Sequence, residues 1–128
     1  MSNAPLDTFT RAYIEAALWS TSIGEGHDCP DDTSLESAGY TIDDIADIAI
    51  SSIVDDCATF QLDNAVKLGQ AGTDEQNGHD FWLTRNGHGA GFWDRGYVHE
   101  IGQGLTDAAH NEASSDWYIG DDGKVYVL

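Results

Sequence analysis

The sequence predicts an α+β domain, in which a mostly antiparallel sheet of about four strands packs with about three helices. Two observations favour this class. Three segments carry apolar residues at helical spacing, and two others place aromatic and β-branched residues on both sides of a glycine-containing turn. Because each of those two segments is expected to fold back on itself, the strands form two hairpins.

The first two helices have recognisable start signals. One is expected over residues 8–20, where Asp7 is a good N-cap and apolar residues recur three and four positions apart. The longest is expected over residues 42–62, with Thr41 and Asp44 resembling a capping box and an extension toward residue 67 left open. Its aspartate-rich first turn suits the positive end of a helix dipole.

The second part of the chain is predicted to alternate hairpin, helix and hairpin. Residues 81–85 and 91–95 are the strands of the first hairpin, joined by a turn over 86–90, and aromatics fall on both of its faces. A third helix is expected over residues 98–113. The segment 116–128 is a second hairpin, because alternating aromatic and β-branched residues flank its DDG turn.

The length predicts a single domain over residues 1–128, divided into an acidic, mainly helical part (1–76) and a hairpin–helix–hairpin part (77–128). Cys29 and Cys57 lack CxxC spacing, which favours reduced thiols. Neither a secretory signal nor an apolar run of about 20 residues is present. The expectation is therefore a cytoplasmic protein that does not enter a membrane.

Charge is the dominant feature of the composition. The chain has 23 Asp and Glu against 5 Lys and Arg, for a formal net charge of -18, and residues 1–80 hold 16 of the acidic groups with two of the bases. Binding DNA or RNA needs clustered Lys and Arg, so direct nucleic-acid binding is excluded. Anionic membranes are excluded for the same reason. The expected partner is a basic protein.

The segment HDFWLTRNGHGAGFWDRG offers a candidate metal site. His79, Asp80, His88 and Asp94 are imidazole and carboxylate groups that zinc or iron accepts. The spacing argues against the site, because HExxH is absent and His88 lies at the predicted turn tip. No nucleophile motif is present either, so an enzyme is not expected and no cofactor is assigned.

A structural interpretation explains more of this segment. Arg85 and Arg95 are two of only five positive charges, and they stand close in sequence to Asp80 and Asp94. We therefore expect an internal arginine–carboxylate network, with the bulky aromatics acting as anchors of the fold.

The string GHDFWLTRNGHGAGFWDRG, followed by a glycine-containing helical segment and the terminal IGDDGKVYVL, resembles a motif of small uncharacterised proteins encoded by bacteriophages and prophages. The resemblance covers residues 77–128. It implies a phage or mobile-element origin, which favours action on host machinery, and it carries no catalytic residues.

The leading hypothesis is a non-enzymatic nucleic-acid mimic that binds and inhibits a nucleic-acid-handling or defence protein of the host cell. Carboxylates along one ridge of the long helix would stand about 6 to 12 Å apart, against one charge per about 1.7 Å of DNA axis. The expected partner-binding residues are Glu25, Asp28, Asp31, Asp32, Glu36, Asp43, Asp44, Asp47, Asp55 and Asp56. Two alternatives stay open: a metal-dependent enzyme or metal-stabilised module built on the His79–Asp94 segment, and a halophilic protein whose charge serves solvation alone. The sequence also leaves a homodimer open.

Overall fold

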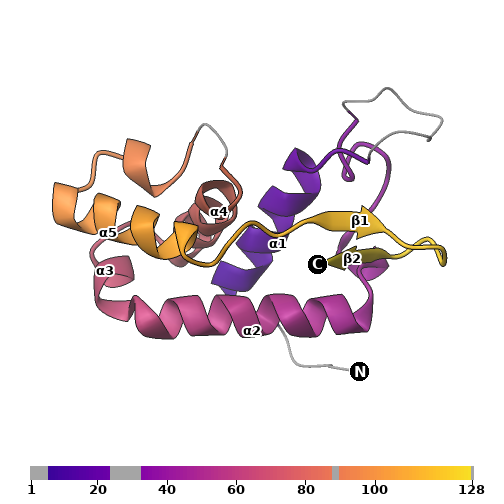
Figure 1. Cartoon of the computed structure of the whole chain (residues 1–128), viewed down its shortest axis with the longest axis horizontal. Helices are drawn as coiled ribbons and strands as arrows, with labels where there is room; N and C mark the ends of the chain where they lie inside the picture. The colour runs from indigo at the N-terminus through magenta and orange to yellow at the C-terminus, as the bar shows by residue number, and fades with distance from the viewer. Residues whose placement is uncertain (1–5, 24–32, 88–89, 128) are drawn as a thin grey trace.

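A computed structural model describes residues 6–23, 33–87 and 90–127 (Figure 1). Helices dominate, and a short hairpin lies at one end of the long axis, opposite α3 and α5. In chain order the elements are α1 (Thr8–Ser20), the 3-10 turn η1 (Ile42–Asp44), α2 (Asp47–Asp63), α3 (Ala65–Gly69), α4 (Asp74–Arg85), the 3-10 turn η2 (Phe92–Asp94), α5 (His99–His110), β1 (Trp117–Ile119) and β2 (Val125–Val127).

Helix α1 has the predicted bounds and the predicted cap. The Thr10 amide donates to Asp7 Oδ1 over 2.8 Å, which satisfies one of the free N–H groups of the first turn. Burial raises the pKa of Asp7, but hydrogen bonds from Thr10 and from the Gln61 side chain outweigh it, so the pKa lies below its usual value.

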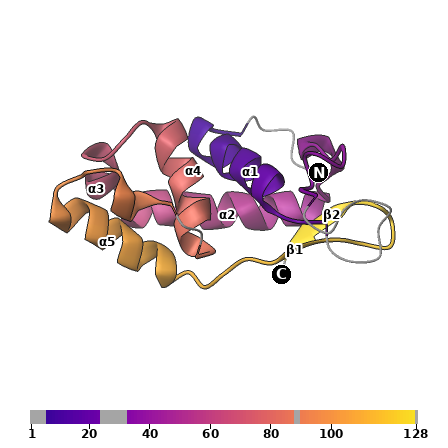
Figure 2. The same cartoon turned by 90° about the horizontal axis from the view of Figure 1, so that it is seen from above.

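Helices α1 and α4 pack in close contact, and Figure 2 shows them side by side with α2 passing beneath. Gly78 of α4 makes this approach possible, because a Cβ on it would overlap the carbonyl oxygen of Phe9. Aromatic rings fill the space between the helices. The Phe81 ring stacks on Phe60 of α2 at 3.9 Å between centroids and lies 5.3 Å from the Tyr13 ring.

The longest helix begins later than predicted. Thr41 and Asp44 do form the capping box, with the Thr41 amide donating to Asp44 Oδ2 over 2.7 Å, but the box caps only η1. Ile45 and Ala46 then adopt extended backbone, and the Ala46 amide donates to the Val125 carbonyl over 2.9 Å. The C-terminal hairpin therefore holds these two residues outside the helix, and α2 starts at Asp47.

The predicted hairpin over 81–95 is wrong. Residues 81–85 are the C-terminal part of α4, which begins at Asp74. The Thr73 hydroxyl caps the helix by accepting from the Gln76 amide over 3.1 Å, and Asp74 and Glu75 lie at its positive end. Phe81 and Trp82, which were expected on a strand, lie instead on a helix that is buried on most of its sides. Residues 92–94 form η2 rather than a returning strand.

The other two expected elements are present. Helix α5 lies within the predicted 98–113, and the terminal hairpin pairs Trp117 with Val127 and Ile119 with Val125 in an antiparallel register. The Trp117 ring packs edge-on against Trp82 at 5.3 Å, which ties the hairpin to α4.

The predicted fold class is therefore wrong. Within the described residues the protein is mostly helical, and its one sheet has two strands instead of about four. The order of the second part is helix, 3-10 turn, helix and hairpin rather than hairpin, helix and hairpin.

Candidate functional site

Four exposed carboxylates on η1 and α2 form the candidate partner-binding surface, which we call the acidic face: Asp43, Asp47, Asp55 and Asp63. Within the described part of the chain, none of the four accepts a hydrogen bond or joins an ion pair. Their charge is therefore directed entirely at solvent or at a partner.

The acidic face is less regular than the predicted ridge. Asp43 belongs to η1 and is separated from α2 by the extended residues 45 and 46, so it does not continue the helix. Asp47, Asp55 and Asp63 follow one another at intervals of about 12 Å along the axis, and each is turned by about 80° from the last. They wind across the outer side of the helix, and their charge is sparser than that of DNA.

The other expected partner-binding residues divide into three groups. Glu36 is exposed, as predicted. Asp44 is partly buried in its capping box, and Asp56 forms an ion pair with Arg85 at 2.8 Å, so both have internal roles. The remaining four lie outside the described residues: Glu25, Asp28, Asp31 and Asp32.

The scarcity of positive charge around the acidic face is marked. Between Arg11 and Lys67 the sequence contains twelve carboxylates and neither lysine nor arginine. Two of the five bases in the chain, Arg85 and Arg95, are committed to carboxylates inside the fold. The negative potential of α2 is therefore compensated by few neighbours.

Exposed carboxylates also occur away from the acidic face. They lie on α1, α4, η2, α5 and on the hairpin with its approach: Glu15, Asp74, Glu75, Asp94, Glu100, Asp107, Asp116, Asp121 and Asp122. The negative surface therefore extends beyond the first eighty residues, although the sequence places most of the net charge there.

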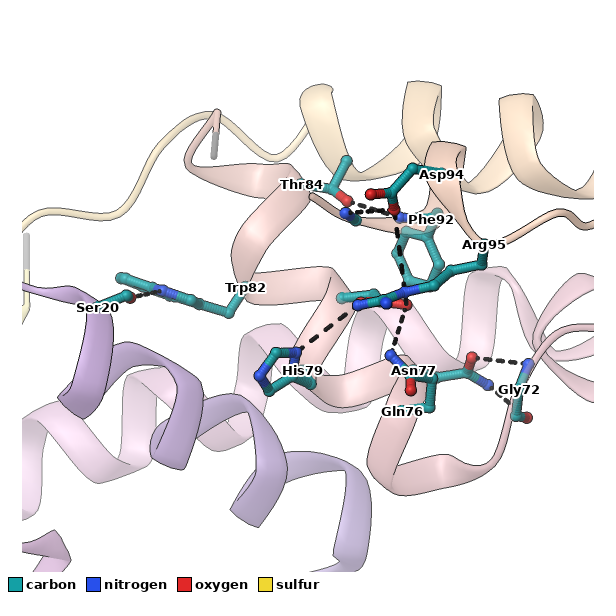
Figure 3. A network of polar contacts seen from close by, with 12 residues as sticks. Ser20, Gly72, Gln76, Asn77, His79, Trp82, Thr84, Phe92, Asp94 and Arg95 are labelled. Atoms are coloured by element: carbon teal, nitrogen blue, oxygen red, sulfur yellow. Dashed lines mark hydrogen bonds and ion pairs between the residues drawn. The ribbon is translucent and has the colours of Figure 1, made fainter. Parts of the chain in front are cut away.

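The conspicuous 79–96 segment is organised around Asp80, whose side chain is fully buried. Arg95 donates to both of its oxygens, with Nη2 to Oδ1 at 2.7 Å and Nε to Oδ2 at 3.0 Å, and Gln76 Nε2 adds a bond to Oδ2 at 3.1 Å. Figure 3 shows Gln76, His79 and Arg95 close together in this network, with the polar contacts drawn as dashed lines. The hydrogen bonds that Arg95 donates to Asp80 raise the pKa of Arg95, so its guanidinium stays charged at physiological pH.

This geometry gives the proposed metal ligands other partners. Asp80 is occupied by Arg95, and Asp94 Oδ1 accepts the Gly91 amide at 3.1 Å, which closes the turn before η2. His79 immediately precedes Asp80 in α4, with its Nδ1 3.9 Å from Asp80 Oδ1, while His88 lies outside the described residues. In the described ranges, no three His, Cys, Asp or Glu side chains are grouped so that they could hold a metal ion.

A shallow pocket of about 440 Å³ adjoins the network, lined by Thr73, Glu75, Gln76, His79 and Arg95. The imidazole of His79 stacks on the half-exposed Trp19 ring at 5.7 Å, a contact that sequence reasoning missed because the two residues are far apart in the chain. The pocket contains the Glu75 carboxylate and the Arg95 guanidinium, which Asp80 already neutralises. It therefore lacks the unpaired positive charge that an anion-binding site needs.

Arg85 is a second internal arginine, and it joins α4 to α1, to α2 and to the segment that follows α5. Its Nη1 donates to Tyr13 Oη at 3.0 Å and to Asp56 at 2.8 Å, and its Nε donates to the Ala113 carbonyl at 2.7 Å. Burial lowers the pKa of Arg85, but the interactions with Tyr13 and Asp56 together raise it by more, so the pKa lies above its usual value. The predicted internal arginine–carboxylate network is thus present, with Asp56 rather than Asp80 as the partner of Arg85.

Comparison with protein families, with curated proteins and with solved structures finds no match. Among the described helices, none combines the length and the apolar character that crossing a membrane requires. The function must therefore be inferred from the residues themselves.

Proposed function

We propose that this protein is a non-enzymatic acidic inhibitor. In the cytoplasm of a host cell it binds a basic protein that handles nucleic acid, and it competes with nucleic acid for that protein. The contact surface is the acidic face, with Glu36 beside it. The phage or prophage origin suggested by the 78–96 motif fits this role, and defence proteins of the host are the expected targets.

The observation that carries the proposal is the contrast between two sets of carboxylates. Asp80 and Asp56 are paired with arginines of the fold, whereas Asp43, Asp47, Asp55 and Asp63 are exposed and have no ion-pair or hydrogen-bond partner among the described residues. Unpaired surface charge of one sign repels itself and destabilises the compact state. Its retention on one helix is expected if the charge recognises a partner.

Electrostatic attraction to a basic partner predicts two properties. Association should be fast at low ionic strength, and it should weaken as salt shortens the Debye length from about 30 Å at 0.01 M to about 10 Å at 0.1 M. Duplex DNA, which has a denser line of charge than α2, should displace the protein from its partner.

The test is affinity capture from a bacterial lysate with two variants of equal charge. The acidic-face variant converts Asp43, Asp47, Asp55 and Asp63 to asparagine. The control variant neutralises Asp74, Glu100, Asp116 and Asp121, which lie on other elements; each variant removes four of the 23 carboxylates. Both sets include an acidic residue in the first turn of a helix, so their effects on stability are matched.

We expect the wild type and the control to retain the same nucleic-acid-binding proteins, which added duplex DNA elutes, and the acidic-face variant to lose them. Equal retention by both variants would show that total charge, rather than a particular surface, governs binding. Retained proteins that DNA does not displace would contradict mimicry.

The exposed carboxylates on α4, α5 and the hairpin favour one alternative, a halophilic protein whose acidic shell only binds water and cations. A salt titration of the free energy of unfolding separates the two. A halophilic protein unfolds at low salt and gains stability up to molar concentrations, whereas the inhibitor stays folded in dilute buffer.

A further inference from the structure

The outer side of α2 carries exposed apolar residues that the fold does not use. Ile48 is 73% exposed and Leu62 79% exposed, while the buried side of the same helix consists of Ala49, Ile53, Cys57 and Phe60. Figure 1 shows α1, α4, α5 and the hairpin all on one side of α2.

Ile48 and Leu62 lie on a common stripe with Asp55 between them. The three residues are spaced by seven, and seven residues turn a helix by about 700°, only about 20° short of two full turns. The stripe is therefore nearly straight, and its apolar ends are separated by about 21 Å along the axis. The intervening positions are small and exposed: Ser51, Ser52, Ala58 and Thr59.

This pattern matches a helix that lies in a groove of a partner, with apolar anchors at each end and small residues where the two backbones approach. We call the set of Ile48, Asp55 and Leu62 the outer stripe. Its charge distribution decides what kind of protein covers it. Asp47, Asp55 and Asp63 surround the apolar residues, and α2 contains no lysine or arginine.

A second copy of the chain does not fit the outer stripe. It would place the same aspartates opposite one another, between two molecules that each carry a formal net charge of -18. A nucleic acid or an anionic membrane would meet the same repulsion. Charge complementarity requires a surface that has apolar pockets opposite Ile48 and Leu62 and positive charge between and beside them.

We propose that the outer stripe docks into a groove on the partner protein that has two apolar pockets for Ile48 and Leu62, a lysine or arginine between them that pairs with Asp55, and further basic residues along its rim. This inference rests on the proposed function and deepens it. The carboxylates of α2 are sparser than DNA phosphates, so apolar contacts supply affinity and selectivity that charge imitation alone lacks.

The test uses two synthetic helical peptides of 18 residues as probes. Both carry the same number of lysines, and on the same face as the lysines one peptide has leucine where the other has serine. Binding to the full-length protein is measured by isothermal titration calorimetry, and the contact is located by amide shift changes in NMR spectra. We expect the leucine peptide to bind at least about tenfold more tightly, because burying one aliphatic side chain is worth about a factor of ten.

Two double variants make the test specific. Ile48→Ser with Leu62→Ser should reduce the affinity of the leucine peptide to that of the serine peptide. The control, Trp93→Ser with Val98→Ser, removes exposed apolar residues elsewhere and should change neither affinity. Circular dichroism checks that both variants remain folded, and Asp55→Asn should weaken both peptides by a similar factor.

Equal binding of the two peptides, or shift changes that avoid α2, would overturn the proposal. So would a concentration-dependent dimer in sedimentation that Ile48→Ser with Leu62→Ser abolishes, since the occupant would then be a second copy. The lysate assay separates this proposal from the proposed function. If the acidic-face variant loses the partner proteins and the Ile48→Ser, Leu62→Ser variant retains them, the docking proposal is wrong and the proposed function stands.

Discussion

Replacing Gly78 by alanine tests the central packing of the fold. In an isolated helix this change is favourable by about 1 kcal/mol, because glycine has a larger conformational freedom to lose. The structure predicts the opposite sign. The added Cβ would lie 2.8 Å from the carbonyl carbon of Phe9 and would overlap its oxygen, and both are backbone atoms of α1 that cannot rotate away.

The size of the effect follows from the distance that the helices must move. Ordinary contacts of a Cβ lie at 3.4–4 Å, so α1 and α4 must separate by about 1 Å. A gap of that size forfeits up to about half of the dispersion energy across the interface, which includes the rings of Tyr13 and Phe81 at 5.3 Å. Overpacking lowers the free energy of unfolding by about 1–3 kcal/mol or more, and the higher helix propensity of alanine offsets a part of this loss. We expect a net loss of about 2 kcal/mol.

Urea unfolding followed by circular dichroism measures this loss, and for a chain of this length thermal unfolding should shift downward by about 10 °C. Gly69→Ala is the matched control, because Gly69 is also helical and a Cβ there meets nothing within 4 Å. The control should be unchanged or slightly more stable. A Gly78→Ala protein as stable as the control would refute the close approach of α1 and α4.

Three further predictions concern buried or capping groups. Arg95→Gln should lower the free energy of unfolding in urea by about 3–5 kcal/mol, because it leaves the fully buried Asp80 carboxylate without its ion-pair partner. Asp80→Asn should lower it by less, because the Arg95 side chain that remains reaches solvent. A larger loss for Asp80→Asn would contradict the assigned burial. Asp7→Ala should cost about 1 kcal/mol at pH 7 through loss of the N-cap. Since the pKa of Asp7 is lowered on folding, this contribution is complete above about pH 4 and is lost as the pH falls through the lowered value. The free energies of unfolding of the wild type and the variant should therefore converge in acid. A difference that does not change with pH would rule out the cap. Burial raises the pKa of the Cys57 thiol and shields it from solvent. In a Cys29→Ser background, Cys57 should therefore react with a disulfide reagent at pH 8 only as fast as the protein unfolds. Fast labelling of the native protein would show that Cys57 is accessible.

Local signals in the sequence were reliable where they act within a few residues. The Asp7 cap, the Thr41–Asp44 capping box and the terminal hairpin are all present, since each depends on hydrogen bonds or turn geometry between near neighbours. The internal use of the arginines was also predictable, because in an acidic chain a rare arginine finds carboxylates readily. The particular partner was not: Arg85 pairs with Asp56, which is 29 residues away.

The 78–96 segment shows why the fold class could not be predicted. Its glycines and aromatics are typical of a hairpin, and the aromatic and apolar residues at 81–83 fit a strand. Tertiary packing favours the helix, since Gly78 admits α1, and Phe81 and Trp82 each contact rings from other elements. Glycine weakens a helix by only about 1 kcal/mol, and burial of two large aromatics outweighs that cost.

The amino-acid sequence by itself determined the sign and scarcity of charge, the ends of α1 and the terminal hairpin, because composition and local hydrogen bonding do not depend on distant residues. Only the tertiary structure decided which carboxylates remain unpaired at the surface and which form ion pairs with arginine. Asp80 and Asp56 are neutralised by arginines that the fold brings to them, while Asp55 stands exposed between Ile48 and Leu62. That selection requires contacts between segments far apart in the chain, and no local pattern encodes it.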